Sequence, residues 1–205
     1  MNFRDVNPVY SPFLYWFAKN IQAMAYRTLW RRKIHGLEHV PPFGTPTIFA
    51  ANHRSLSDPS DVGSCLPYPI FYFAKEELFH IPVLGWGIRR VNAFPVRRKE
   101  HDVAALKTAI EVLEHGGGLM LFPEGGRRLD PHRQWKAKAG VGMLACKTGA
   151  HIVPVGIKNA DRFTKLAPLE VTFGAALVPP KNPTQEDYQK LADTVMTRIK
   201  ELCHE

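Results

Sequence analysis

The chain has 205 residues, of which 45% are hydrophobic and 11% aromatic. This length and composition suit one globular domain and exclude an intrinsically disordered chain. The net charge of +8 favours anionic partners, a class that includes nucleic acids, anionic membrane surfaces and phosphorylated substrates.

The cysteines and histidines do not predict a metal site or a disulfide framework. Cys65, Cys146 and Cys203 are odd in number and have no CxxC spacing, which favours a reducing compartment. The histidines show no ligand spacing of the HExxH type. We therefore expect neither a bound metal nor a resident cofactor.

Residues 9–30 are unusually aromatic, but Lys19 and Arg27 interrupt the apolar run. A membrane span needs roughly 20 mostly apolar residues, so this segment fits better as a helix lying in a bilayer interface. Each basic residue near an anionic leaflet contributes about 1 kcal/mol. The alternative is that the aromatic rings cover the core of the domain itself, and the two interpretations are compatible. The residues expected to contact the membrane are Phe13, Trp16, Phe17, Trp30, Arg31, Arg32 and Lys33.

The first half of the globular part predicts strands that alternate with helices. An apolar run at 47–51 predicts a buried strand, and Asp58 and Pro59 predict the start of a helix over about 59–66. A second strand is expected at 70–74 and a short extended run at 93–96. Residues 78–90 are apolar but punctuated by Pro and Gly.

The second half continues the alternation. A helix with Val103, Leu106, Ile110 and Leu113 on one face should stop at the glycines of 116–118. Further elements are expected as strands at 119–122, 152–157 and 169–177 and as helices at 138–148 and from about 184. Pro154 suggests an edge strand or a strand end.

This order predicts an α/β fold, a single domain whose mostly parallel sheet is flanked by helices. We divide the chain into an N-terminal aromatic and basic amphipathic helical segment at 1–35 and a globular domain at 36–205. The carboxyl ends of the strands are where open α/β sheets usually hold their ligands.

His53 and Asp58 lie in the turn between the strand at 47–51 and the helix that follows. Within one helix, five residues of separation would place them about 140° apart, whereas a turn lets the carboxylate reach the imidazole. A histidine held by a carboxylate is a ready general base near neutral pH. The alternative is that Asp58 only caps the helix and His53 only lies at its rim.

A second group of candidates follows the strand at 119–122. Gly125 and Gly126 let the backbone approach a ligand, Arg127 can make forked hydrogen bonds to a phosphate, and Glu124 can accept from a hydroxyl. The alternative is a surface turn in which Glu124 pairs with a neighbouring arginine. Arg98 ends the extended run at 93–96 in a similar way, and its alternative is a solvated basic patch.

Four blocks in this order resemble the glycerolipid acyltransferase family, and the lysophosphatidic acid acyltransferases in particular. They are Asn52–Asp58 (NHxxxxD), Gly85–Arg98, Phe122–Arg127 (compare FPEGTR) and Val153–Val155. The chain departs from the family pattern at Asn92, Arg97, Gly126 and Arg128. Because the second and third blocks shape acceptor binding in that family, these departures affect the acceptor rather than the His–Asp chemistry.

The resemblance implies transfer of a fatty acyl group from acyl-CoA or acyl carrier protein to a lysophospholipid hydroxyl, in phospholipid biosynthesis. His53 would be the general base and Asp58 would fix its tautomer. Arg98 and Arg127 would hold the phosphate of an acceptor such as lysophosphatidic acid, with Gly125 and Gly126 beside it, and Glu124 would orient the glycerol. The expected location is the cytoplasmic face of a membrane, as a peripheral protein.

Two other functions are compatible with the same residues. A thioesterase or lipid hydrolase would use the His–Asp pair to activate water, and a non-catalytic basic module would only bind a membrane. Nucleic acid is not an expected partner, because the sequence contains no helix-turn-helix signature, RNP motif or zinc finger.

Overall fold

The computed structural model describes residues 1–97, 102–127 and 136–204. These residues form one seven-stranded sheet in the order β1-β7-β6-β2-β5-β3-β4. Every neighbouring pair is parallel except β6 and β7. The strands are β1 (Lys33–His35), β2 (Thr47–Ala51), β3 (Phe71–Lys75), β4 (Ala93–Val96), β5 (Gly118–Leu121), β6 (His151–Lys158) and β7 (Glu170–Phe173). The predicted α/β fold with a mostly parallel sheet is confirmed.

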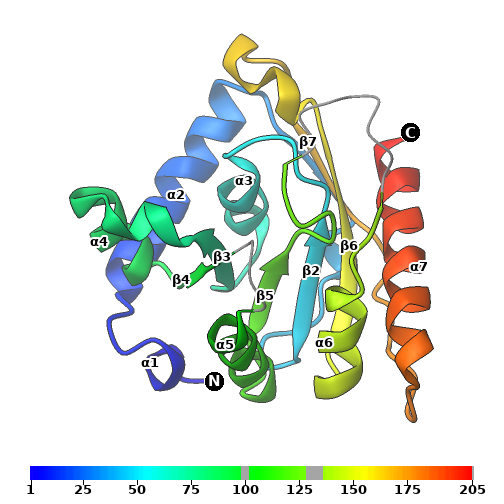
Figure 1. Cartoon of the computed structure of the whole chain (residues 1–205). Helices are drawn as coiled ribbons and strands as arrows, with labels where there is room; N and C mark the ends of the chain where they lie inside the picture. The colour runs from blue at the N-terminus through cyan, green and yellow to red at the C-terminus, as the bar shows by residue number, and fades with distance from the viewer. Residues whose placement is uncertain (98–101, 128–135, 205) are drawn as a thin grey trace.

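Helices cover both faces of the sheet (Figure 1). On one face lie α5 (Val103–Glu114), α6 (Gly140–Thr148) and α7 (Gln185–Cys203), and on the other lies α3 (Asp58–Cys65), against which α2 (Pro12–Thr28) packs. The central strand β2 is buried along its whole length, which explains its continuous apolar run. The remaining helical elements are α1 (Phe3–Val6), α4 (Pro82–Arg90) and the 3₁₀ turns η1 (Leu37–His39), η2 (Glu76–His80) and η3 (Ala160–Lys165).

The helix boundaries follow the sequence signals. Asp102 caps α5 by accepting a hydrogen bond from the Ala105 N–H, and Gly116 adopts a left-handed φ of 76° after its end. Thr184 and Asp187 form a capping box at the start of α7. These local signals are why the predicted positions of both helices are confirmed.

The expectation that Pro154 marks an edge or a strand end is wrong, because β6 lies between β2 and β7. On the β7 side, an isolated bridge at Ile152 is separated from the regular ladder, which begins at Val155. Pro154 falls in this interruption, where its carbonyl accepts a hydrogen bond of 2.8 Å from the Gly174 N–H. An inner strand therefore tolerates the proline because the missing N–H coincides with a gap in the ladder.

The strand β1 and the helix α4 were not predicted. β1 has only three residues, too few for an alternating pattern, and it joins the sheet by pairing with β7. α4 contains Gly85 and Gly87 within nine residues, which hides its helical pattern. The predicted strand at 169–177 is also shorter than expected, since β7 ends at Phe173.

The N-terminal segment contributes to the core and also has an exposed apolar side. Tyr15 and Tyr26 of α2 are buried, whereas Phe13, Trp16 and Phe17 are exposed. The Tyr15 hydroxyl accepts a hydrogen bond from the Ile70 N–H at 3.1 Å, which ties α2 to the start of β3. Within the described residues, no helix combines the length and the apolar character needed to cross a bilayer.

Residues 30–33, at the basic end of this segment, are also partly exposed and partly buried. Arg31 and Lys33 are exposed, and Trp30 is half-buried with its ring stacked on Phe163 at a centroid distance of 4.3 Å. The predicted membrane contact of Arg32 is wrong, because its side chain is only 4% exposed and pairs with Asp61 at 2.8 Å. Its charge is therefore satisfied inside the protein.

Candidate active site

The end of β2 is fixed to β6 by the side chain of Asn52. Its amide nitrogen donates to the Ile157 carbonyl, and its amide oxygen accepts from the Ile157 N–H, both at 2.8 Å. The buried side chain thus continues the pairing of β2 with β6 by one position. As a result, the backbone is held rigidly at the point where the next residue, His53, leaves the sheet.

His53 and Asp58 meet in the β2–α3 turn, as predicted. The imidazole Nδ1 lies 2.8 Å from Asp58 Oδ2, and both side chains are almost completely buried. An ionised carboxylate can only accept, so Nδ1 carries the proton and Nε2 is the basic nitrogen. This arrangement suits a general base whose tautomer is fixed by its neighbour.

The contacts of Asp58 do not support a role limited to helix capping. Its Oδ2 atom accepts the backbone N–H groups of Arg54 and Ser55, both at 2.8 Å, in addition to the His53 ring. These donors precede Asp58 in the chain, while Ser57 takes the N-cap position of α3. The carboxylate therefore organises the turn around the imidazole.

The turn after β5 packs directly against His53. The Phe122 ring is stacked on the imidazole at a centroid distance of 3.8 Å and an interplanar angle of 14°. Glu124 is buried, and its Oε1 accepts the His53 backbone N–H at 3.0 Å. This hydrogen bond joins two turns that are 71 residues apart in sequence, and Glu124 is buried rather than exposed on a surface turn.

The structure gives a reason for glycine at position 125 but not at position 126. Gly125 has a φ of +72°, and a Cβ there would lie 2.6 Å from Cε of Lys138. A Cβ on Gly126 would meet no atom within 4 Å, so this residue faces open space. The backbone N–H of Lys138 also donates to the Pro123 carbonyl at 2.9 Å. Lys138 is thereby placed over the turn that contains Gly125 and Gly126, called the glycine turn below. The sequence did not predict this position.

A cavity of about 390 Å³ opens beside His53. The turn residues His53, Pro123, Gly125 and Gly126 line it, together with Arg97, Asp102 and Lys138. The rest of its wall is mainly apolar and comes from strand ends, α5 and α6: Phe73, Val96, Val103, Ala105, Leu106, Leu121, Phe122, Gly140, Val141, Met143 and Leu144. An apolar cavity with a few polar groups near one reactive side chain is typical of a small-molecule site.

The cationic residues are arranged less simply than predicted. The Arg97 guanidinium is held by Glu76, with Nε–Oε2 at 2.8 Å and Nη2–Oε1 at 3.1 Å. The hydrogen bond from Arg97 lowers the pKa of Glu76, so this carboxylate remains a partner for the guanidinium. Arg127 follows the glycine turn and is half-buried, whereas the predicted phosphate ligand Arg98 lies outside the described residues.

No described serine or cysteine is placed as a nucleophile activated by His53. The hydroxyls of Ser55 and Ser57 are hydrogen-bonded to each other at 2.8 Å, while the described partner of the His53 ring is Asp58. Burial raises the pKa of the Cys65 thiol to about 12, which keeps it protonated and unreactive. Across residues 1–97, 102–127 and 136–204, no cluster of three His, Cys, Asp or Glu side chains could hold a metal ion.

Comparison with known proteins gives a consistent result. The model of a family described as Acyltransferase matches residues 31–158, more than half of the chain. A chloroplastic 1-acyl-sn-glycerol-3-phosphate acyltransferase of Arabidopsis thaliana is 30% identical over 76% of this chain and 44% of that protein. A 1-acyl-sn-glycerol-3-phosphate acyltransferase of Bacillus subtilis is 28% identical over 83% of this chain and 87% of that protein.

A solved structure shares both fold and sequence. The crystal structure of the 1-acyl-sn-glycerophosphate (LPA) acyltransferase from Thermotoga maritima superposes with a TM-score of 0.71 at 28% identity, covering 92% of this chain and 79% of that one. The chain spans less than half the length of the chloroplast relatives, 44% in Arabidopsis and in Brassica napus.

Proposed function

Because the chain belongs to the acyltransferase family, we propose that it transfers a fatty acyl group from an acyl thioester to the hydroxyl of lysophosphatidic acid, a step of phospholipid biosynthesis. The observation that carries this proposal is the contact of His53 Nδ1 with Asp58 Oδ2 in the wall of an apolar cavity. The pair supplies a base, and the cavity supplies a place for the acyl chain.

The proposed reaction needs only this base. His53 Nε2 removes the proton of the acceptor hydroxyl, and the oxygen attacks the thioester carbonyl carbon to form a tetrahedral intermediate. Collapse of the intermediate breaks the C–S bond, and the imidazolium returns its proton to the leaving thiolate. Asp58 stabilises the imidazolium formed between these steps. General-base assistance of this kind contributes about 10²–10⁴-fold to the rate.

Direct transfer is favoured over an acyl-enzyme by the surroundings of His53. The two nearby serine hydroxyls bond each other, and the Cys65 thiol stays protonated. A covalent route would need a nucleophile hydrogen-bonded to its base.

The acyl chain is assigned to the part of the cavity between α5 and α6. Leu106, Val141 and Leu144 belong to this apolar wall. The volume of about 390 Å³ lies within the range of pockets that enclose small ligands. With the chain seated there, the thioester carbonyl would lie close to the imidazole.

The acceptor phosphate is assigned to the cationic rim of the same cavity. Arg97 and Lys138 line it, and Arg127 follows the glycine turn. Guanidinium groups recognise phosphate oxygens through paired hydrogen bonds, while a lysine acts as a point charge. Arg98 stays part of this proposal on the basis of the family resemblance, and Glu124 is assigned to the glycerol portion on the same basis.

We also place the protein at the cytoplasmic face of a membrane, as a peripheral enzyme. The exposed rings of Phe13, Trp16 and Phe17 support this placement, because aromatic residues favour the depth of the lipid headgroups. Both the acceptor and the product of the reaction would reside in that layer.

The function is tested with a panel of lysophospholipids, each supplied with palmitoyl-CoA or with palmitoyl acyl carrier protein, and with mass spectrometry of the products. Phosphatidic acid formed from lysophosphatidic acid supports the proposal, and loss of the product in His53→Ala with an unchanged circular dichroism spectrum supports the assigned base. Free palmitate without acylated lipid would indicate a thioesterase or lipid hydrolase. Wild-type turnover in His53→Ala would remove the assigned mechanism.

A further inference from the structure

Helix α4 shows an unusual distribution of side chains. Its buried residue is Gly85, and a Cβ there would lie 2.3 Å from the Phe79 carbonyl oxygen. Its large apolar residues lie mostly outside: Val83 is 83% exposed and Trp86 52% exposed, Leu84 is also exposed, and Ile88 is half-buried. Ile81, the N-cap residue before α4, is exposed as well. An ordinary surface helix buries its apolar face against the protein, whereas α4 exposes apolar side chains to solvent.

The carboxyl end of α4 lies next to the start of α2. The Ser11 N–H donates to the Arg90 carbonyl at 3.1 Å, and Asn7 Nδ2 donates to the Arg89 carbonyl at 2.7 Å. These hydrogen bonds join the end of α4 to the N-cap of α2 and to Asn7 in the segment before it, and Figure 1 shows α4 near the N-terminal part of α2. The exposed apolar residues of α2 recur at helical spacing and form one stripe: Phe13, Trp16, Phe17, Ile21 and Met24.

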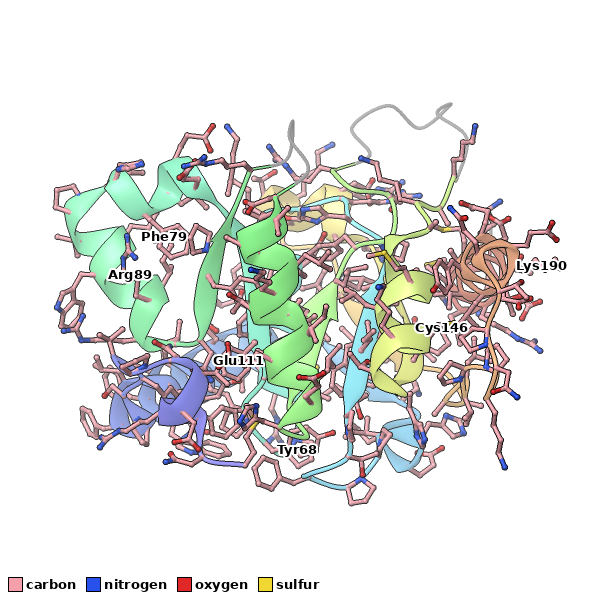
Figure 2. All side chains as sticks on the ribbon, turned by 60° about the horizontal axis from the view of Figure 1, so that its bottom comes forward. Tyr68, Phe79, Arg89, Glu111, Cys146 and Lys190 are labelled. Atoms are coloured by element: carbon pink, nitrogen blue, oxygen red, sulfur yellow. The ribbon has the colours of Figure 1, made fainter. Side chains whose placement is uncertain are left out.

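The charges carried by the two helices themselves have one sign. Neither α2 nor α4 contains Asp or Glu, and both carry basic residues. Lys19 Nζ lies 4.5 Å above the Trp16 ring and the Arg90 guanidinium 4.2 Å from the Trp86 ring centroid. Arg89 covers the Phe79 ring at 4.8 Å, and both residues are labelled beside α4 in Figure 2. Indole rings paired with cations suit the depth at which lipid headgroups meet acyl chains.

We propose that α4 is a second membrane-contact element beside α2, and that its partner is an anionic bilayer surface. This inference rests on the proposed function, because that function requires lipid substrates. A second copy of the chain fits the surface less well, since it would bring the same positive charges into contact. Exposed apolar residues on helices whose only charges are positive are instead complementary to anionic lipid.

The position of α4 connects the bilayer to the cavity. The chain passes from α4 through β4 to Val96 and Arg97, which both line the cavity beside His53. Contact through α4 as well as α2 would fix the orientation of this wall relative to the bilayer, which a single helix could not do.

The test compares Val83→Asp with the matched control Val178→Asp. Both valines are exposed, at 83% and 66%, but Val178 follows β7 and lies outside α2 and α4. Aspartate is compatible with the first turn of α4, so the helix should persist. Binding is measured by sedimentation with vesicles of phosphatidylcholine containing about one third phosphatidylglycerol. We expect Val83→Asp to lower the partition coefficient about tenfold and Val178→Asp to leave it unchanged.

A second readout follows Trp86 itself. Brominated phosphatidylcholine in the same vesicles quenches indoles that enter the bilayer. The quenched fraction of the fluorescence should therefore fall in Trp86→Phe relative to the wild-type protein. Equal vesicle binding by the two aspartate variants, or unchanged quenching in Trp86→Phe, would overturn the inference. So would self-association of the protein that depends on Val83 without any binding to vesicles.

The outcome is separable from that of the proposed function. With substrates dispersed in detergent, both aspartate variants should transfer acyl groups at the wild-type rate. If the wild-type protein transfers none, the proposed function fails, while the vesicle experiment still decides whether α4 contacts lipid.

Discussion

Helix α3 carries two buried carboxylates one turn apart, and their comparison shows how the proposed reactive pair differs from a structural one. Asp58 Oδ2 lies 2.8 Å from the His53 imidazole, and Asp61 Oδ1 lies 2.8 Å from the Arg32 guanidinium. All four side chains are at most 4% exposed. Distance and burial therefore do not separate the two pairs.

The two pairs differ in the cation and in what surrounds it. The imidazole has a second ring nitrogen that can accept a proton, and His53 lines the cavity. The guanidinium keeps its charge, and Arg32 also donates to the Asp61 carbonyl at 3.0 Å and to Ser64 Oγ at 2.6 Å. The first pair is the one proposed to take a proton from the acceptor hydroxyl, while the second fastens the segment after α2 to α3.

The largest effect should come from removing the negative charge of the first pair. In Asp58→Asn, an amide oxygen in the place of Oδ2 can still accept hydrogen bonds from the backbone N–H groups of Arg54 and Ser55 and from His53 Nδ1. The charge that would stabilise the imidazolium is lost, so His53 becomes a weaker base. We expect the rate of acyl transfer to fall about 10²–10⁴-fold, measured by steady-state kinetics with palmitoyl-CoA and lysophosphatidic acid.

Thermal unfolding serves as the control for Asp58→Asn. A midpoint near that of the wild-type protein would assign the loss of rate to chemistry. A rate within about threefold of wild type would instead contradict the role of the pair as a base.

The second pair should respond in stability instead. Arg32→Met retains an unbranched chain but leaves Asp61 and Ser64 without their donor. Breaking a buried ion pair on one side costs about 3–5 kcal/mol, and we expect a loss of this size in the free energy of unfolding from urea titration. The turnover of the folded fraction should stay close to wild type.

The neighbouring Arg31 is a matched control, because it has the same charge but is exposed. Arg31→Met should change the unfolding free energy by no more than about 0.5 kcal/mol. If Arg32→Met lost turnover at unchanged stability, the distinction between the two pairs would be wrong.

The pH dependence of stability should carry a signature of Asp61. Burial raises its pKa from 3.8 to about 6, although the hydrogen bond and charge of Arg32 lower it. Because the folded state binds this proton more tightly, the stabilising contribution is complete below about pH 3.8 and is lost as the pH rises through about 6. The contribution is at most about 3 kcal/mol.

Asp61→Asn cannot titrate and removes this contribution. The unfolding free energy of the wild-type protein minus that of Asp61→Asn should therefore decrease as pH rises through this window and become constant above it. The measurement is urea unfolding of both proteins at several pH values between about 4 and 8. A difference that does not change with pH would show that Asp61 has no raised pKa.

The same comparison explains how far the sequence could be interpreted. The His53–Asp58 contact was predictable because both residues belong to one turn, whose strand and helix are marked by local patterns. The Arg32–Asp61 pair was not, since its members are 29 residues apart and belong to different elements. Arg32 therefore had the sequence pattern of a surface cation and was assigned to the membrane.

The other site residues also divide into those predicted from a local motif and those placed by contacts between distant segments. The glycine turn after β5 was predicted from a short motif, but the hydrogen bond from the His53 N–H to Glu124 depends on β2 and β5 being neighbours. Lys138 lies over Gly125 through the entry into α6. Its position is evident only from the structure, because nothing in the sequence between the glycine turn and Lys138 indicates that Lys138 lines the same cavity.

The smallest expected effect tests the cavity beside His53, whose presence distinguishes the first pair from the second. Gly140 lines it, and a Cβ at this position would meet no atom within 4 Å. Gly140→Leu should therefore occupy the acyl region without displacing neighbours, and leucine favours a helix more than glycine does. We expect turnover with palmitoyl-CoA to fall about tenfold, or about 1.4 kcal/mol in transition-state binding, while octanoyl-CoA is used at the wild-type rate.

Gly87→Leu is the control for this substitution, because Gly87 is also helical and open but does not line the cavity. With detergent-dispersed substrates it should leave both rates unchanged. Equal loss of rate with both donors in Gly140→Leu would mean that the cavity does not hold the acyl chain. The reactive pair would then differ from the structural one only by its imidazole, and the apolar wall between α5 and α6 would need another explanation.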